Sequence, residues 1–238
     1  MQYTKQNYLS LLNCFREAGY QDHVFGEEFG KSKSVFLRHD IDISLELALE
    51  FAEMEYQNGY RSTYFVLVDT EFYNVLSADN RQRVVDICQM GHQIGLHFDA
   101  SNSVDQAALD IRINVECDIL GGITGNPIKA VAPHRPTTDF LGRPGSICGR
   151  IHPYQPRYFL DMKYVSDSMG GWTRDHPIEN EAFAAGQNLQ ILTHPYIWAS
   201  PQCHNQSEKI RCVLDQSRMQ LERAARHNFT TYCSKDTA

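Results

Sequence analysis

Carboxylate and imidazole side chains recur at the points where short apolar runs of this sequence end. Asp40 and Asp42 lie at the end of one such run, His97 ends a second, and His194 follows a third. Two carboxylates two positions apart on an extended strand point the same way, and they repel unless a cation lies between them or one is protonated. Neutral imidazole is the most common metal ligand among side chains. The pattern predicts a metal-dependent hydrolase site, with capping of a following helix as the simpler alternative for Asp42.

Two further apolar runs also lead into polar residues. His134 and Arg135 stand between two prolines, whose rings stiffen the backbone, and Asp167 follows the run 163–166. An arginine here can orient a carboxylate base or bind an oxyanion, and a histidine such as His194 can act as a general acid near neutral pH. Three nearby aromatic residues are candidates for stacking on a sugar ring, although core packing is the more frequent role of any one: Trp172, Tyr196 and Trp198.

Segments of strand and helix character alternate along the chain and must position these residues. Strand-like runs occupy residues 34–40, 62–68, 92–97, 129–132, 163–166 and 189–193. Helical spacing of apolar residues occurs at 7–18, 44–58, 80–90, 104–120 and 208–227, and the fourth helix is expected to end at Gly121-Gly122. A Gly- and Pro-rich loop is expected over 137–156. The alternation predicts a mainly parallel sheet, whose strands place their carboxyl ends on one rim, where α/β active sites are built.

Composition limits the classes of partner and compartment. A formal net charge of −7 without a Lys/Arg cluster argues against binding to nucleic acid or to an anionic membrane surface. No apolar run approaches a membrane span, and the first residues lack the order of a signal peptide. The seven cysteines are irregularly spaced, which favours free thiols. We therefore expect one cytoplasmic domain over residues 1–238.

Taken together, these segments resemble the polysaccharide deacetylase superfamily, also called the NodB homology or carbohydrate esterase family 4 group. Asp40-Ile41-Asp42, preceded by Arg38-His39, is similar to the first family motif in an Arg-His-Asp-X-Asp form. The segments similar to the second to fifth motifs are 91–97, His134-Arg135-Pro136, 164–172 around Asp167, and 192–194. The resemblance spans about residues 33–198 with the motifs in the family's order, and the terminal helices are expected to pack on this region.

The resemblance implies a distorted (β/α)7 barrel and a function. That function is metal-dependent N-deacetylation of an acetamido sugar or a surface-polysaccharide intermediate, so the expected partner is a small-molecule or oligosaccharide substrate. Nitrogen ligands favour Zn²⁺ as the divalent metal. Two alternatives stay open: hydrolysis of a non-sugar amide or cyclic imide, and a catalytically inactive barrel that binds carbohydrate.

The same match implies a role for each polar residue of the rim. Asp40 would be the base that activates water, and His194 would be the acid. Arg135, supported by Asp167, would hold Asp40 in place.

The metal ligands follow from the same match, with one departure from the family pattern. Asp42 and His97 match two ligands of the family, but the position of its second ligand histidine holds Ser101. His134 is the preferred replacement for that ligand. The alternatives are a water molecule, His39 and Asp99.

Overall fold

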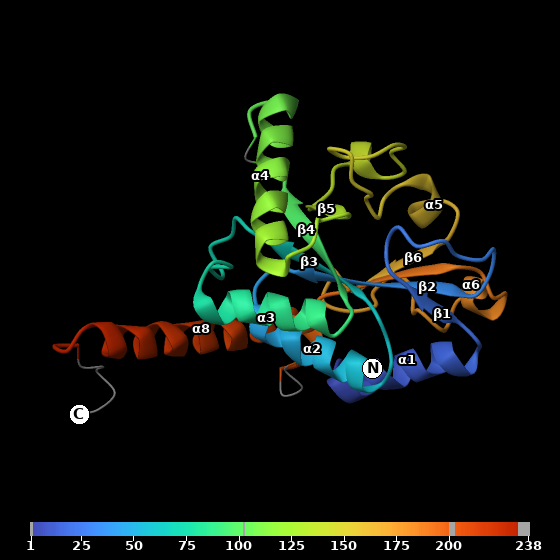
Figure 1. The fold of residues 1–238 in the computed structure, drawn as a ribbon. Helices are drawn as coiled ribbons and strands as arrows, with labels where there is room; N and C mark the ends of the chain where they lie inside the picture. The colour runs from blue at the N-terminus through green and yellow to red at the C-terminus, as the bar shows by residue number, and fades with distance from the viewer. Residues whose placement is uncertain (1, 102, 200–202, 233–238) are drawn as a thin grey trace.

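The architecture is a curved, all-parallel β-sheet with helices on its outer face (Figure 1). The computed structural model describes residues 2–101, 103–199 and 203–232. Its strands are β1 (Gln21–His23), β2 (Ser34–Ile41), β3 (Thr63–Leu67), β4 (Gln93–Asp99), β5 (Val131–His134), β6 (Lys163–Ser166) and β7 (Leu189–Thr193). Its helices are α1 (Lys5–Glu17), α2 (Leu45–Gln57), α3 (Ala78–Gln89), α4 (Gln106–Thr124), the 3-10 turn η1 (Thr138–Phe140), α5 (Pro156–Phe159), α6 (Glu181–Ala184), α7 (Pro195–Ala199) and α8 (Gln206–Asn228).

The order of the strands explains how distant parts of the chain meet. The sheet runs β5-β4-β3-β2-β7-β6, with β1 beside the start of β2, and every pairing is parallel. The order ends at β5 on one side and at β6 on the other, so the barrel is distorted and open rather than closed by a ladder between these two strands. The expected α/β barrel of NodB type is therefore confirmed. Strand β1 consists of Gln-Asp-His and has no apolar residue, so its sequence does not predict a strand.

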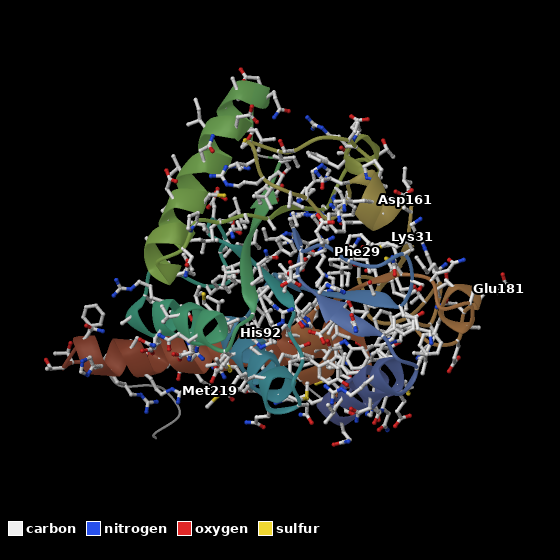
Figure 2. All side chains as sticks on the ribbon, turned by 45° about the vertical axis from the view of Figure 1, so that its right-hand side comes forward. Phe29, Lys31, His92, Asp161, Glu181 and Met219 are labelled. Carbon is white, nitrogen blue, oxygen red and sulfur yellow. The ribbon has the colours of Figure 1, made fainter. Side chains whose placement is uncertain are left out.

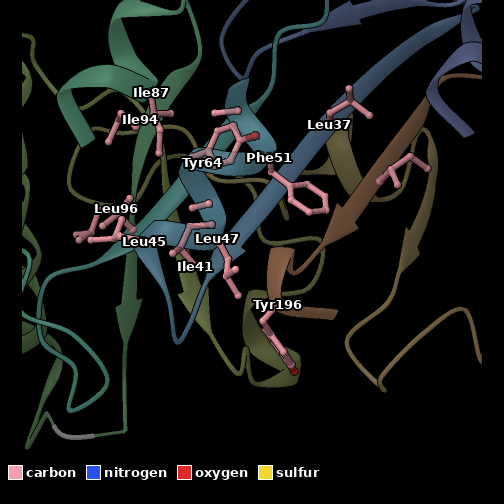
Figure 3. Close-up of a cluster of buried hydrophobic side chains, with 14 of the residues drawn as sticks. Leu37, Ile41, Leu45, Leu47, Phe51, Tyr64, Ile87, Ile94, Leu96 and Tyr196 are labelled. Atoms are coloured by element: carbon pink, nitrogen blue, oxygen red, sulfur yellow. The ribbon is translucent and has the colours of Figure 1, made fainter. Parts of the chain in front are cut away.

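Strand β2 separates two chemical environments by simple alternation. Leu37 and Ile41 face the outer helices and pack in the main core, where Figure 3 shows them beside Phe51 of α2. Phe36 faces the inside of the barrel and belongs to a second apolar cluster with Phe65. Side chains that follow Phe36 at every second position, up to the strand end, therefore also face inward.

The second apolar cluster fills the part of the barrel interior that lies away from the carboxyl ends of the strands. Its buried members are Phe25, Phe36, Phe65, Ala130, Ala132, Tyr158 and Met162. Gly95 of β4 lacks a side chain because a Cβ there would lie 2.6 Å from the Phe65 ring and 3.0 Å from the Ala130 carbonyl oxygen. These rings fill the interior beneath the polar residues at the carboxyl ends of the strands, among them Asp40 and His97.

Helix α4 differs from expectation in its extent, whereas α8 has nearly the expected bounds and differs in its packing. Helix α4 does not end at Gly121-Gly122 but continues to Thr124, and Gly125 closes it in a left-handed conformation with a φ of 70°. A glycine inside a helix costs only about 1 kcal/mol relative to alanine, so the pair does not stop it. The buried residues of helix α8, Lys209 and Val213, belong to its first turns, and Gln220 farther along donates to Glu46 of α2. The end of the helix, beyond Met219 as labelled in Figure 2, projects from the body. None of the described helices is both long and apolar enough to cross a membrane.

Candidate active site

Three predicted metal ligands come together at the carboxyl rim of the sheet. Asp42 follows β2, His97 lies on β4 and His134 ends β5. The Asp42 Oδ1 atom lies 3.4 Å from His97 Nε2 and 3.4 Å from His134 Nδ1, and the two imidazole nitrogens are 3.2 Å apart. Ligand atoms about 2.0–2.2 Å from a tetrahedral zinc ion are separated by about 3.3–3.6 Å. The triangle of donor atoms therefore has the dimensions of one face of such a site.

The hydrogen-bonding pattern of the triad also fits a cation. His97 Nδ1 lies 2.8 Å from the carbonyl oxygen of Ala132 and donates to it, which leaves the lone pair of Nε2 facing the other two ligands. Asp42 Oδ1 is buried without a hydrogen-bond partner among the described residues. Burial opposes ionisation of Asp42, but His134 and His97 outweigh it and hold its pKa well below the usual range. Three electron-pair donors that converge on one point repel one another unless a positive ion lies among them.

Asp40, the candidate base, is fixed by a residue other than the expected one. Arg38 donates from Nε to Asp40 Oδ1 and from Nη2 to Asp40 Oδ2, each at 2.8 Å, and both side chains are buried. Burial raises the pKa of the Asp40 carboxyl, but the adjacent guanidinium of Arg38 outweighs it and the pKa is lowered overall. Asp40 Oδ2 lies 3.5 Å from His97 Nε2, so an ionised carboxylate borders the metal triad.

Arg135 does not contact Asp40, which corrects the expectation from the third motif. Its backbone adopts a φ of 52°, a left-handed conformation, and its side chain is 76% exposed. The Nη2 group instead lies 3.2 Å from Asp99 Oδ2 at the surface of the rim. The unusual φ turns the chain between its flanking prolines so that His134 reaches the triad while Arg135 lies at the exposed rim of the adjacent cavity.

Asp167 supports His194 rather than an arginine, which corrects a second expected contact. Its Oδ1 lies 2.6 Å from His194 Nδ1, its carboxylate accepts from the His194 backbone NH, and its Oδ2 accepts from Trp198 Nε1 at 2.8 Å. His194 Nε2 lies 3.6 Å from Asp42 Oδ2 and faces the triad. Burial lowers the pKa of His194, but the Asp167 carboxylate outweighs it, and the pKa is raised to about 9. The pair is built to hold a proton beside the metal triad.

The three aromatic candidates have different positions. Trp198 is completely buried against Tyr3 and Tyr8, so it belongs to the core and cannot stack on a substrate. Trp172 lines a separate hollow next to α1 and does not line the cavity at Asp42. Only Tyr196 lines that cavity, and its hydroxyl accepts a hydrogen bond from Gln206 at 2.8 Å.

The cavity beside the triad has a volume of about 400 Å³. Asp42, Asp99, His134 and Tyr196 line it together with a segment after β3 that was not singled out from the sequence. That segment contributes Asp69, Thr70, Glu71 and Phe72. It is a loop without a motif, and only its place after the central strand β3 could have indicated a role at the rim.

The alternative third ligands are occupied elsewhere. His39 faces the outer side of β2, where its Nε2 lies 2.9 Å from Glu55 and its Nδ1 lies 2.7 Å from Thr193 Oγ1. Asp99 pairs with Arg135 and accepts from the backbone NH of Ser101 at 2.8 Å. The geometry therefore favours His134 in the place that Ser101 leaves open.

Comparisons with known proteins agree on the fold. No protein-family model and no curated protein matches the chain. The chitin deacetylase of the fungal pathogen Colletotrichum lindemuthianum superposes with a TM-score of 0.50 at 14% identity, over 83% of this chain and 86% of that one. This likeness shows that the two chains share a fold, as the resemblance to carbohydrate esterase family 4 implied.

Other solved structures superpose less closely. The peptidoglycan deacetylase PdaC of Bacillus subtilis gives a TM-score of 0.48 at 14% identity, over 85% of this chain and 98% of that one. A CE4 family pseudoenzyme of Bacillus anthracis gives 0.43 at 13% identity, over 84% of this chain. The chain spans 65% of that pseudoenzyme's length.

Proposed function

We propose that the protein is a metal-dependent N-deacetylase that hydrolyses the amide of an acetamido sugar or of a surface-polysaccharide intermediate. The observation that supports this most directly is the juxtaposition of three elements beside the cavity that Asp42 and His134 line. These are the donor triangle of Asp42, His97 and His134, the buried carboxylate of Asp40, and the imidazole of His194. An acyl-transfer hydrolase needs an electrophilic centre, a base and an acid within reach of one substrate bond.

In this proposal, Asp40 and His194 each carry out one of the two proton transfers of the reaction. Asp40, held ionised by Arg38, accepts the proton of the attacking water. His194 donates a proton to the nitrogen that leaves, and Asp167 keeps the imidazole in the required orientation through its contact with Nδ1. A divalent cation held by Asp42, His97 and His134 would polarise the acyl oxygen and make the water more acidic. Zinc is the proposed metal because two of the three ligands are nitrogens.

The cavity and the fold support the proposed substrate class. A volume of about 400 Å³ is within the range of small-molecule sites, about 300–1,000 Å³, and accommodates one sugar ring or a short segment of an oligosaccharide. Tyr196 and Phe72 supply apolar surface on which a sugar face can rest. Asp69 and Glu71 supply carboxylates that can accept hydrogen bonds from its hydroxyl groups. The proposed compartment is the cytoplasm, in keeping with the free thiols of the described cysteines.

Metal analysis combined with acetate release tests the proposal. The protein as purified is expected to contain one divalent metal ion per chain and to release acetate from N-acetylated sugars. His97→Ala should lose both the metal and the activity. His227→Ala, at the exposed end of α8, is the matched control and should keep both. Full metal content and rate in His97→Ala would refute the assignment.

The outcome also separates the two alternative functions. Metal retention with hydrolysis of cyclic imides or simple amides, and none of acetamido sugars, would identify a non-sugar amidase. Sugar binding without metal and without released acetate would identify an inactive carbohydrate-binding barrel.

A further inference from the structure

Arg38 is a buried cation that donates from two of its three nitrogens to one acceptor group, while its Nη1 has no hydrogen-bond partner among the described residues. It is among the largest side chains with no exposed surface in the described chain. Two of its nitrogens, Nε and Nη2, contact the two oxygens of Asp40 at 2.8 Å each. Such a fork-to-fork pair fixes the plane and the rotation of a carboxylate, which a single contact cannot do.

The surroundings hold the guanidinium in this geometry. Its central carbon lies 5.3 Å from the centre of the Phe65 ring and 4.9 Å from that of Tyr154, which belongs to the segment between η1 and α5. Aromatic faces attract cations, and packing on both rings leaves the side chain no room to change rotamer. Arg38 and Asp40 also lie two positions apart on β2, so the strand itself sets their relative position.

We propose that Arg38 is the positioning residue of the catalytic base and acts on the reaction only through Asp40. Arg135, the residue expected in this role, lies at the exposed rim and pairs with Asp99. The inference rests on the proposed function. Arg38 turns the Asp40 carboxylate so that Oδ2 faces the metal triad, 3.5 Å from His97 Nε2, where the attacking water must lie. Each carboxylate oxygen keeps a further lone pair that can accept the proton of that water.

A double-substitution cycle tests this assignment. Arg38→Met removes the fork and keeps an unbranched side chain, and we expect kcat to fall about 100-fold while KM changes by less than about threefold and metal content stays the same. In an Asp40→Asn background, the same substitution should lower kcat by less than about threefold further, because Arg38 then has no base to position. Arg38→Lys should restore part of the rate, since a point charge gives one contact instead of two.

Arg135→Met is the matched control because it makes the same chemical change at the exposed arginine. Its effect on kcat should multiply with that of Asp40→Asn, as expected for independent sites. If the losses of kcat caused by Arg38→Met and Asp40→Asn multiply in the double variant, Arg38 does not position the base. The same conclusion follows if Arg135→Met, and not Arg38→Met, has little further effect on kcat in the Asp40→Asn background.

A second measurement needs neither activity nor a stable Arg38 variant. In protein labelled with ¹⁵N-arginine, the Arg38 Nε–H signal should exchange slowly with water and should shift in Asp40→Asn but not in Asp99→Asn. The Asp99 substitution should move only the Arg135 signal. An Arg38 Nε–H signal whose chemical shift is unchanged in Asp40→Asn overturns the proposal. Absence of metal and of acetate release in the wild type would instead overturn the proposed function, and the NMR result would still show whether Arg38 holds Asp40.

Discussion

The buried carboxylate of Glu55 connects the core to the strands that carry the candidate acid and base. Glu55 lies on α2 without exposed surface and accepts hydrogen bonds from Tyr8 and Tyr64 at 2.7 Å each. Its Oε1 also lies 2.9 Å from His39, whose other ring nitrogen lies 2.7 Å from Thr193 Oγ1. His39 precedes Asp40 and Thr193 precedes His194, so this network ties together β2 and β7 directly behind the site.

Replacement of Glu55 by glutamine should destabilise the protein in a pH-dependent way. Burial opposes ionisation, but His39 and the other partners outweigh it and lower the pKa of Glu55 from 4.5 to about 2. At about 1.4 kcal/mol per pKa unit, this corresponds to about 3 kcal/mol of stability at pH 7. Because the pKa is lower in the folded state, the contribution is complete above about pH 4.5 and is lost as the pH falls toward 2. About 1 kcal/mol should remain at pH 3.

Urea unfolding of metal-free protein, followed by circular dichroism, measures this effect. The difference in unfolding free energy between wild type and Glu55→Gln should shrink by about 2 kcal/mol from pH 7 to pH 3. Glu116→Gln is a matched control for which stability should depend on pH in the opposite direction, because burial raises the pKa of Glu116 to about 7. Glu116→Gln should therefore gain stability relative to the wild type as the pH rises from about 4.5 to 8. A difference for Glu55→Gln that is the same at both pH values would refute the account.

Three further predictions concern the site and its support. Zn²⁺ at about 100 times its Kd should raise the thermal midpoint of the metal-free protein by about 5–10 °C in calorimetry, and His134→Ala should abolish this rise; an equal rise in the variant would exclude His134 as a ligand. Asp167→Asn should lower kcat about 10- to 1,000-fold in initial-rate measurements, because the proton of His194 loses its support, while metal content stays constant; loss of metal instead would indicate a ligand role. Gly95→Ala should lower the unfolding free energy by about 1–3 kcal/mol in denaturant titrations because its Cβ would overlap Phe65, and an unchanged midpoint would contradict that contact.

The convergence of the rim residues was predictable from the sequence because it follows from topology alone. Polar residues at the ends of apolar runs, joined by helices, must meet when those runs form parallel strands with a common carboxyl edge. This reasoning predicted that Asp40, Asp42, His97, His134 and His194 share one rim, where the structure places them. The short helices α5, α6 and α7 gave no such signal, because a helix of four or five residues is too short to show helical spacing and is stabilised by its tertiary contacts.

The direction of each side chain was decided only by the tertiary structure. Alternation along β2 does place Arg38 on the same side as Asp40, and this was the available signal for their pair. Nothing local to Arg135 shows that its φ is positive and that its guanidinium lies at the exposed rim. Likewise, Trp198 is a core residue because Tyr3 and Tyr8, almost two hundred positions earlier in the chain, pack against it. The sequence determined which residues reach the rim, because the residues at the carboxyl end of each strand can be read from that strand's own segment. The tertiary structure decided their partners, because burial and hydrogen bonding depend on segments far apart in the chain.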